Sequence, residues 1–146
     1  MKELAWEIGE TYRSLRRYYD RRAAALGVTT AQWRVLAWLG HSPGLKQVEL
    51  AERLDVEPIT AGRIIDRLEE AGLVERQPDP VDRRAWRLML TAKAGPIIAR
   101  LTELADEMSD EAFADFDIEE LETMRTRLAR MRSNIGRAEA AMRKSA

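Results

Sequence analysis

The stretch that decides the fold covers residues 45–91: LKQVELAERLDVEPITAGRIIDRLEEAGLVERQPDPVDRRAWRLMLT. Its first half has apolar residues at helical spacing, which predicts a short helix over 45–54 and a second helix over 58–71. Pro58 suits the first position of a helix, where its missing N–H costs nothing, and Gly72 suits the position just after the end. Four apolar residues of the second helix are expected to face the core: Ile59, Ile64, Ile65 and Leu68.

The second half of this stretch changes to the pattern of a β-hairpin. Residues 73–76 and 86–90 predict two short strands, and the loop between them, residues 77–85, is rich in proline and aspartate. Thr91 is expected to cap the next helix. Two short helices followed by a hairpin make a winged helix-turn-helix. The expected fold class is therefore mainly α with a small β-hairpin wing.

A winged helix-turn-helix suggests contact with double-stranded DNA, because the major groove admits one helix and shows a distinct donor and acceptor pattern for each base pair. The second helix of the pair enters the groove with its N-terminal residues first. Arg63 can pair with guanine there, whereas Arg67, one turn later, is expected at phosphate or in solvent. The alternative is an ordinary exposed helix face. The candidate contact residues are Pro58, Ile59, Thr60, Ala61, Arg63 and Arg67.

The loop of the hairpin supplies further candidates. Arg83 and Arg84 lie on a loop stiffened by prolines. An arginine at such a tip can enter a minor groove, where narrow A·T-rich DNA concentrates negative potential. Asp82 can hold a guanidinium by a charge-assisted hydrogen bond, or it can simply form the turn. The alternative for the two arginines is a solvated loop.

Helices are expected on both sides of this unit. Amphipathic patterns predict one over 3–26, one that starts near Thr29, and a long one over 92–114. Gly95–Pro96 lies in the first turns of the long helix, which must therefore start later or bend. After Asp117 a coiled-coil-like seam has apolar residues three and four apart: Leu121, Met124, Leu128, Met131, Ile135, Ala138 and Met142.

This order predicts two functional regions. Residues 29–91 are expected to form a DNA-binding winged helix-turn-helix lobe, flanked by a helical region formed by residues 1–28 and 92–146. Within the helical region, the methionine-rich seam at 124–142 is expected to pack against a second copy, since methionine fills irregular gaps between packed helices.

Composition limits the classes of function. The chain has 146 residues, of which 45% are hydrophobic and 34% charged, with a net charge of −1, so DNA binding must depend on where the charges lie. There is no cysteine and one histidine, His41. We therefore expect no metal and no cofactor, and in the absence of a nucleophile–base pair no catalytic residues and no enzyme. No apolar run suits a membrane span or a signal peptide, so the protein is expected in the cytoplasm, away from membranes.

The chain resembles the MarR family of transcriptional regulators, and within it the SlyA-like members. The resemblance rests on LGVTTAQWRVLAWL at 26–39 and on VELAERLDVEPITAGRIIDRLEEAGLVERQPDPVDRRAWRLMLTAKAG at 48–95. Its most specific parts are GLVER at 72–76, the tip at 82–84 and the exit at 90–91. The sequence departs from the common pattern at two positions: Asp55 stands where glycine is frequent, and Glu57 where a serine or threonine cap is frequent.

The resemblance implies a homodimer that binds a pseudo-palindrome, with residues 1–28 and 92–146 as its helical dimerisation region. It implies that the helix over 58–71 reads the major groove and that Arg84 enters the minor groove with Asp82 supporting it, while Arg83 is expected at a phosphate. Many members are repressors that small aromatic or phenolic ligands release from DNA. The ligand pocket usually lies between the dimer base and the DNA-binding lobe.

The expected function is therefore sequence-specific transcription regulation by a homodimeric repressor that a small ligand modulates, with aromatic compounds as the candidate class. Three aromatic residues are candidates to line the ligand pocket, although aromatics at helical spacing more often pack in a core: Tyr18, Trp33 and Trp38. Two alternatives remain. The protein can act without a small-molecule signal, by competing with other proteins for DNA, or it can be a helical module that binds protein.

Overall fold

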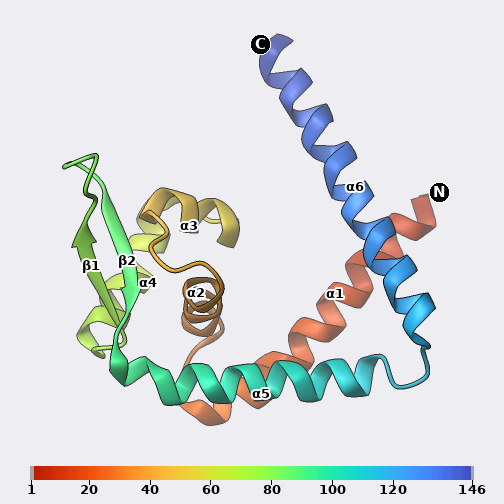
Figure 1. The fold of residues 1–146 in the computed structure, drawn as a ribbon, viewed down its shortest axis with the longest axis horizontal. Helices are drawn as coiled ribbons and strands as arrows, with labels where there is room; N and C mark the ends of the chain where they lie inside the picture. The colour runs from red at the N-terminus through yellow and green to blue at the C-terminus, as the bar shows by residue number, and fades with distance from the viewer. Residues whose placement is uncertain (1, 146) are drawn as a thin grey trace. The chain divides into compact units, whose positions relative to one another are not determined.

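The computed structural model describes residues 2–145, and it confirms the mainly helical fold with a two-stranded hairpin (Figure 1). By their internal contacts residues 1–108 and 109–146 form two compact units, which are described separately here. The helices are α1 (Lys2–Ala23), α2 (Thr30–His41), α3 (Gln47–Leu54), α4 (Pro58–Glu70), α5 (Gly95–Ala112) and α6 (Ile118–Ser145), with short 3₁₀ turns at Ala24–Leu26 and Ala92–Ala94; the strands are β1 (Val74–Pro78) and β2 (Trp86–Leu90).

Several helix ends follow directly from local sequence. The hydroxyl of Thr29 accepts the N–H of Gln32 (3.2 Å), and the Gln32 side chain accepts the N–H of Thr29 (2.9 Å), which is a capping box. The same reciprocal pair forms between Asp117 and Glu120 before α6. Gly72 follows α4 in the left-handed conformation, at φ 73°, which glycine adopts without steric cost.

The turn between α3 and α4 is built on Asp55, which is left-handed at φ 56° and ψ 49°. Aspartate visits this region more readily than most residues because its short polar side chain can bond locally. The N–H of Val56 then donates to the carbonyl of Ala51 (3.1 Å) and closes the end of α3. Glu57 is extended and its side chain makes no capping hydrogen bond, so α4 begins at Pro58 without a side-chain cap.

A third backbone segment joins the hairpin. The N–H of Leu88 donates to the carbonyl of Leu45 (3.0 Å), the N–H of Gly44 donates to the carbonyl of Leu88 (3.1 Å), and Lys46 forms an isolated bridge with Arg87. The prediction of a helix from residue 45 was therefore wrong at its start, because these bonds hold the backbone extended until α3 begins. β1 pairs antiparallel with β2, and it begins one residue later and extends further than the sequence predicted.

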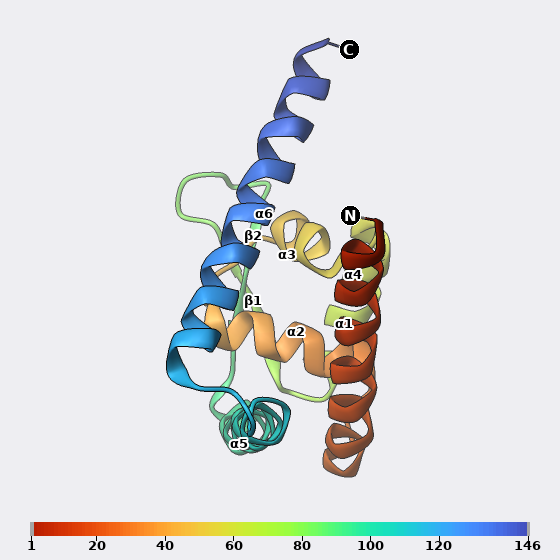
Figure 2. The same ribbon diagram turned by 90° about the vertical axis from the view of Figure 1, so that its right-hand side faces the viewer.

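One apolar core joins α1, α2, α3, α4, α5 and both strands of the hairpin. Figure 2 shows α2 (orange) lying lengthwise between α3 and α5. The hydroxyl of Tyr19 on α1 donates to the carbonyl of Leu101 on α5 (2.7 Å), which adds a buried polar link. The most deeply buried large side chains of this core are Val35, Leu36, Leu39, Leu50, Ile65, Leu68, Val74 and Leu88.

The segment that leads from the hairpin into α5 corrects one prediction and decides another. Thr91 makes no side-chain cap; its hydroxyl donates instead to the carbonyl of Gly72 (2.6 Å) and ties the exit of the hairpin to the end of α4. The long helix begins only at Gly95, after the 3₁₀ turn, so Pro96 occupies its second position, where a missing N–H costs nothing.

In α6 no side chain is buried over its described length, and the predicted seam is exposed or half-exposed. Met124, Ile135 and Met142 are the exposed large members of the seam. None of the helices formed by residues 2–145 combines the length and the apolar character that crossing a membrane requires.

Candidate nucleic-acid interface

α4 presents most of its predicted contact residues to solvent. Pro58, Ile59, Thr60, Arg63 and Arg67 are all exposed. α4 turns its other face to the core through Ala61, Ile65 and Leu68, which recur at helical spacing. Two predictions about which side of α4 faces solvent are wrong.

The first failure concerns Ala61, which was placed among the contact residues but is completely buried, so that its side chain has no surface to offer a partner. The second concerns Ile59, which was expected to face the core but has 67% of its surface exposed. Two residues along a helix point to nearly opposite sides, so the burial of Ala61 and the exposure of Ile59 are one fact about the orientation of α4.

The wing tip carries two exposed arginines, and the side chain of Arg84 is 96% exposed. The carboxylate of Asp82 accepts the backbone N–H of Arg84 at 3.0 Å, whereas the Nε of Arg84 lies 3.9 Å from it. The second distance is too long for a hydrogen bond. Asp82 therefore acts first as a turn former, and its hold on the guanidinium is an exposed ion pair.

Sequence reasoning missed the residue that holds the wing, Asp79, which lies buried at the base of the loop. Its carboxylate accepts the backbone N–H groups of Val81 (2.8 Å) and Asp82 (2.9 Å) and the Nε of Arg87 (2.7 Å). The Nζ of Lys46 lies 3.9 Å away. These backbone bonds, and next the bond from Arg87, hold the pKa of Asp79 far below its ordinary value. The available signal was the Asp-Pro pair, since aspartate commonly accepts N–H groups that follow it in a turn.

Two of the three acidic residues in the distal half of α4, Asp66 and Glu69, are bonded within the protein. Arg76 on β1 donates to Asp66 (2.7 Å) and to Glu69, and its backbone N–H donates to Glu69 (3.0 Å). The same guanidinium lies 3.4 Å from the side-chain oxygen of Gln47 on α3. Arg76 therefore balances negative charge on α4 and joins α4 to the wing.

The start of α4 and the wing tip border one surface hollow of about 300 Å³. Pro58 and Arg84, which are far apart in the sequence, both line it, so the fold brings the two predicted contact sets together. The other lining residues come from the start of α3 and from the wing: Lys46, Gln47, Val48, Ala85 and Trp86.

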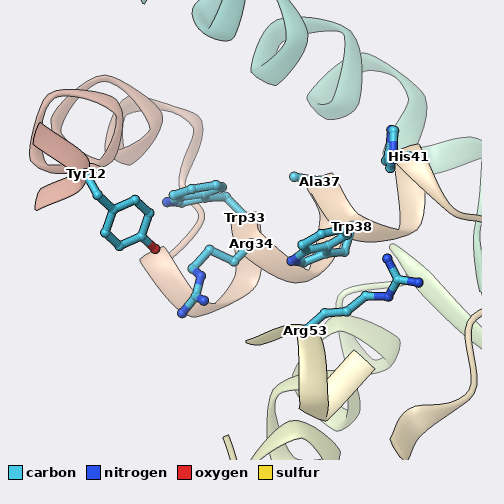
Figure 3. A pocket seen from close by; sticks show the side chains of 7 residues that line it. All are labelled: Tyr12, Trp33, Arg34, Ala37, Trp38, His41 and Arg53. Carbon is cyan, nitrogen blue, oxygen red and sulfur yellow. The ribbon is translucent and has the colours of Figure 1, made fainter. Parts of the chain in front are cut away.

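A second cavity, of about 450 Å³, lies beside α2 and is lined by Trp33, Trp38 and the side chains in Figure 3. The guanidinium of Arg53 on α3 lies over the ring of Trp38 at 5.0 Å, and Arg34 donates to the carbonyl of Leu54 at 3.0 Å. The sequence singled out the two tryptophans but missed the arginines. The full lining is Tyr12, Trp33, Arg34, Ala37, Trp38, His41 and Arg53.

Tyr18, the third predicted pocket residue, does not line this cavity. Its hydroxyl accepts a hydrogen bond from Arg22 (2.5 Å), whose guanidinium also lies over the Tyr18 ring. Trp33 serves the core as well as the cavity: its ring packs on Tyr19 at 4.4 Å between centroids, and its Nε1 donates to Asp20 (2.7 Å). Histidine, aspartate and glutamate side chains of residues 2–145 form no group that could hold a metal ion.

This chain is similar in sequence and in fold to proteins of known structure. Residues 26–85 match the model of the MarR family. The crystal structure of the transcriptional regulator PA3341 has 33% sequence identity and a TM-score of 0.86 over 92% of this chain and 98% of that chain. The transcriptional regulator SlyA has 26% identity and a TM-score of 0.76 over 92% and 95% of the two chains.

A mutant MarR from E. coli, solved in complex with operator DNA, has 26% identity and a TM-score of 0.74 over 88% of this chain and 93% of that chain. The likeness therefore extends from the winged helix-turn-helix to the flanking helices, and the sequence identity over nearly the whole length of PA3341 exceeds what a shared fold alone requires. This chain belongs to the MarR family of transcriptional regulators.

Proposed function

We propose that the protein is a transcription repressor that binds a pseudo-palindromic operator as a homodimer. A small aromatic ligand releases it from the DNA. The observation that carries the proposal is the hollow that the start of α4 and the arginine tip of the wing share. The structure of a related MarR with operator DNA supports double-stranded DNA as the partner.

In this proposal α4 enters the major groove. Thr60 and Arg63 contact base edges or phosphates, and Arg67 contacts phosphate one turn later. Arg84 enters the adjacent minor groove with Asp82 beside it, and Arg83 contacts a phosphate. The lobe of residues 29–91 thereby does the binding.

A net charge of −1 does not oppose this assignment. Asp66 and Glu69 on α4 are already bonded to Arg76, and Asp79 is buried under the wing. Asp66, Glu69 and Asp79 therefore have cationic partners within the protein, and Arg84 projects into solvent. Glu57, directly before α4, is exposed and makes no capping hydrogen bond. Local charge, not total charge, sets the attraction for DNA phosphates.

Dimerisation through residues 1–28 and 92–146 is supported by the exposed seam of α6, whose apolar side chains gain from a second helix. Charge segregation adds to this support. Between Leu101 and Met124 the chain has acidic but no basic residues, whereas from Arg125 to Lys144 it has basic residues and only Glu139 as an acid. Two copies packed antiparallel would place each basic segment against the partner's acidic segment, as a twofold axis allows.

The cavity beside α2 fits a small aromatic carboxylate. Trp33 and Trp38 offer apolar faces, and Arg34 and Arg53 offer positive charge. The lining joins Tyr12 of α1 to Arg53 of α3, so a bound ligand contacts both a helix of the proposed dimer base and a helix of the lobe. The two recognition helices must lie ~34 Å apart to reach both half-sites. A ligand that binds more tightly to the dimer with a different spacing shifts the population away from the DNA-binding state.

Selection from sheared genomic DNA at fixed, near-physiological salt tests the central proposal. We expect the purified protein to retain a few intergenic inverted repeats with half-sites about one helical turn apart, as sequencing of the retained fragments will show. Retention without sequence preference would favour competition for DNA without an operator. A folded dimer that retains no DNA would favour the protein-binding alternative.

Replacing Arg84 with alanine should weaken operator binding by about fivefold or more, because a groove contact is worth roughly 1–3 kcal/mol. Fluorescence anisotropy over a series of salt concentrations measures both the affinity and its salt dependence. Arg100→Ala is the matched control, since its guanidinium is bonded to Glu103 and Glu107 on its own helix, α5. Equal affinities of the two variants would show that the wing assignment is wrong.

Asp79→Asn should loosen the wing, because the amide lacks the charge that binds Arg87 and two backbone N–H groups. We expect faster tryptic cleavage after Arg83 and Arg84 and weaker operator binding, with the exposed Asp110→Asn as the control for charge. Because the pKa of Asp79 lies below its ordinary value of 3.8, its stabilisation of the wing is complete above about pH 4 and is lost as the pH falls through the lower pKa of the folded state. Unchanged cleavage in Asp79→Asn would contradict the role.

Benzoate should raise the melting temperature of the protein and weaken its binding to the operator. Cyclohexanecarboxylate, which has the same charge without the aromatic ring, should do less, and Arg53→Ala should reduce both effects of benzoate because it removes a cation from the cavity. Differential scanning fluorimetry and anisotropy measure the two effects. If a panel of aromatic acids changes neither quantity, the ligand part of the proposal fails.

A further inference from the structure

Three apolar residues are exposed at the surface and do not pack in the core. Val48, the second residue of α3, is 51% exposed, and Ile59, the second residue of α4, is 67% exposed. Pro58 is also exposed, and it lines the same hollow as Val48. A single exposed apolar side chain is ordinary, but here apolar side chains stand at the leading ends of both helices of the helix-turn-helix.

Cationic and polar side chains lie around these residues, together with two exposed acids, Glu49 and Glu57, that neighbour Val48 and Pro58 in the sequence. Lys46, Gln47 and Arg84 line the hollow with Val48 and Pro58, and Thr60 and Arg63 follow Ile59 on the exposed side of α4. An apolar protein partner would bring no charge to match these cations. The matching surface is anionic and carries isolated methyl groups, which describes the major groove of DNA, where thymine alone among the four bases has a C5-methyl group.

We propose that Ile59, supported by Pro58 and Val48, contacts the C5-methyl group of a thymine in each half-site and so selects thymine over cytosine at that position. The inference rests on the proposed DNA-binding function and adds a specificity-determining residue to it. The residues that bond to base edges or phosphates have polar side chains, whereas Ile59 has no donor or acceptor in its side chain and can distinguish bases only by shape and apolar contact.

Deoxyuridine tests this directly, because it differs from thymidine only in lacking the methyl group and keeps the same hydrogen-bonding edge. Duplexes selected from a random library are synthesised with each thymine replaced in turn by uracil, and their affinities are measured by anisotropy. Removing one buried methyl should weaken binding about fourfold, and removing one in each half-site about fifteenfold. One thymine position per half-site should show this loss.

Ile59→Ala completes the test. Since Ile59 is largely exposed, the variant should keep the melting temperature of the wild type, and it should bind the thymine and uracil duplexes with nearly equal affinity. Val81→Ala is the matched comparison: Val81 is an aliphatic side chain on the wing loop, 89% exposed, and its loss should leave the thymine-to-uracil ratio at the wild-type value.

The outcomes are distinguishable. Equal affinity of the wild type for thymine and uracil duplexes overturns the inference and leaves the proposed DNA-binding function intact. A uracil penalty that persists in Ile59→Ala also overturns it, because another residue must then contact the methyl group. If no duplex is retained from the library, the proposed function fails and the inference fails with it.

Discussion

Leu68 of α4 and Leu88 of β2 are both completely buried in the same apolar core, and the rest of the proposed interface depends on that constraint. The recognition helix and the wing are therefore fixed to one packed interior, where even small changes in volume are costly. Leu88 also exchanges backbone hydrogen bonds with Gly44 and Leu45 ahead of α3. The separation between the start of α4 and the base of the wing follows from this packing, and the proposed contact with two adjacent grooves of DNA needs such a fixed separation.

The wing tip extends beyond that core and is held by a polar anchor. An apolar anchor would have needed a larger side-chain cluster under a short loop, whereas the carboxylate of Asp79 satisfies two backbone N–H groups and Arg87 within one small volume. Buried carboxylates are tolerated when every oxygen is bonded in this way. The loop can then direct Arg83 and Arg84 into solvent and remain ordered at its base.

Local chemistry explains which features the sequence could predict. The capping box at Thr29 and the left-handed Gly72 depend on neighbours within a few residues, so the pattern of residues is sufficient. The anchoring role of Asp79 depends on Arg87 across the hairpin, and the orientation of Ile59 depends on which side of α4 meets the core. When apolar residues lie on both sides of a helix, the sequence pattern does not show which side faces the core, and only the packing of the folded protein decides it.

The cavity beside α2 is connected to the recognition helix by a short chain of contacts. Arg34, in its lining, donates to the carbonyl of Leu54, the last residue of α3, and Asp55 follows with the left-handed turn that leads into α4. Arg53, also in the lining, lies one residue earlier on α3. A ligand that draws either guanidinium towards itself acts on the end of α3 directly, one turn before α4 begins. The proposed coupling between ligand and DNA therefore needs only that this turn has two arrangements of similar free energy, since a ligand can shift an equilibrium only by its difference in affinity for two states.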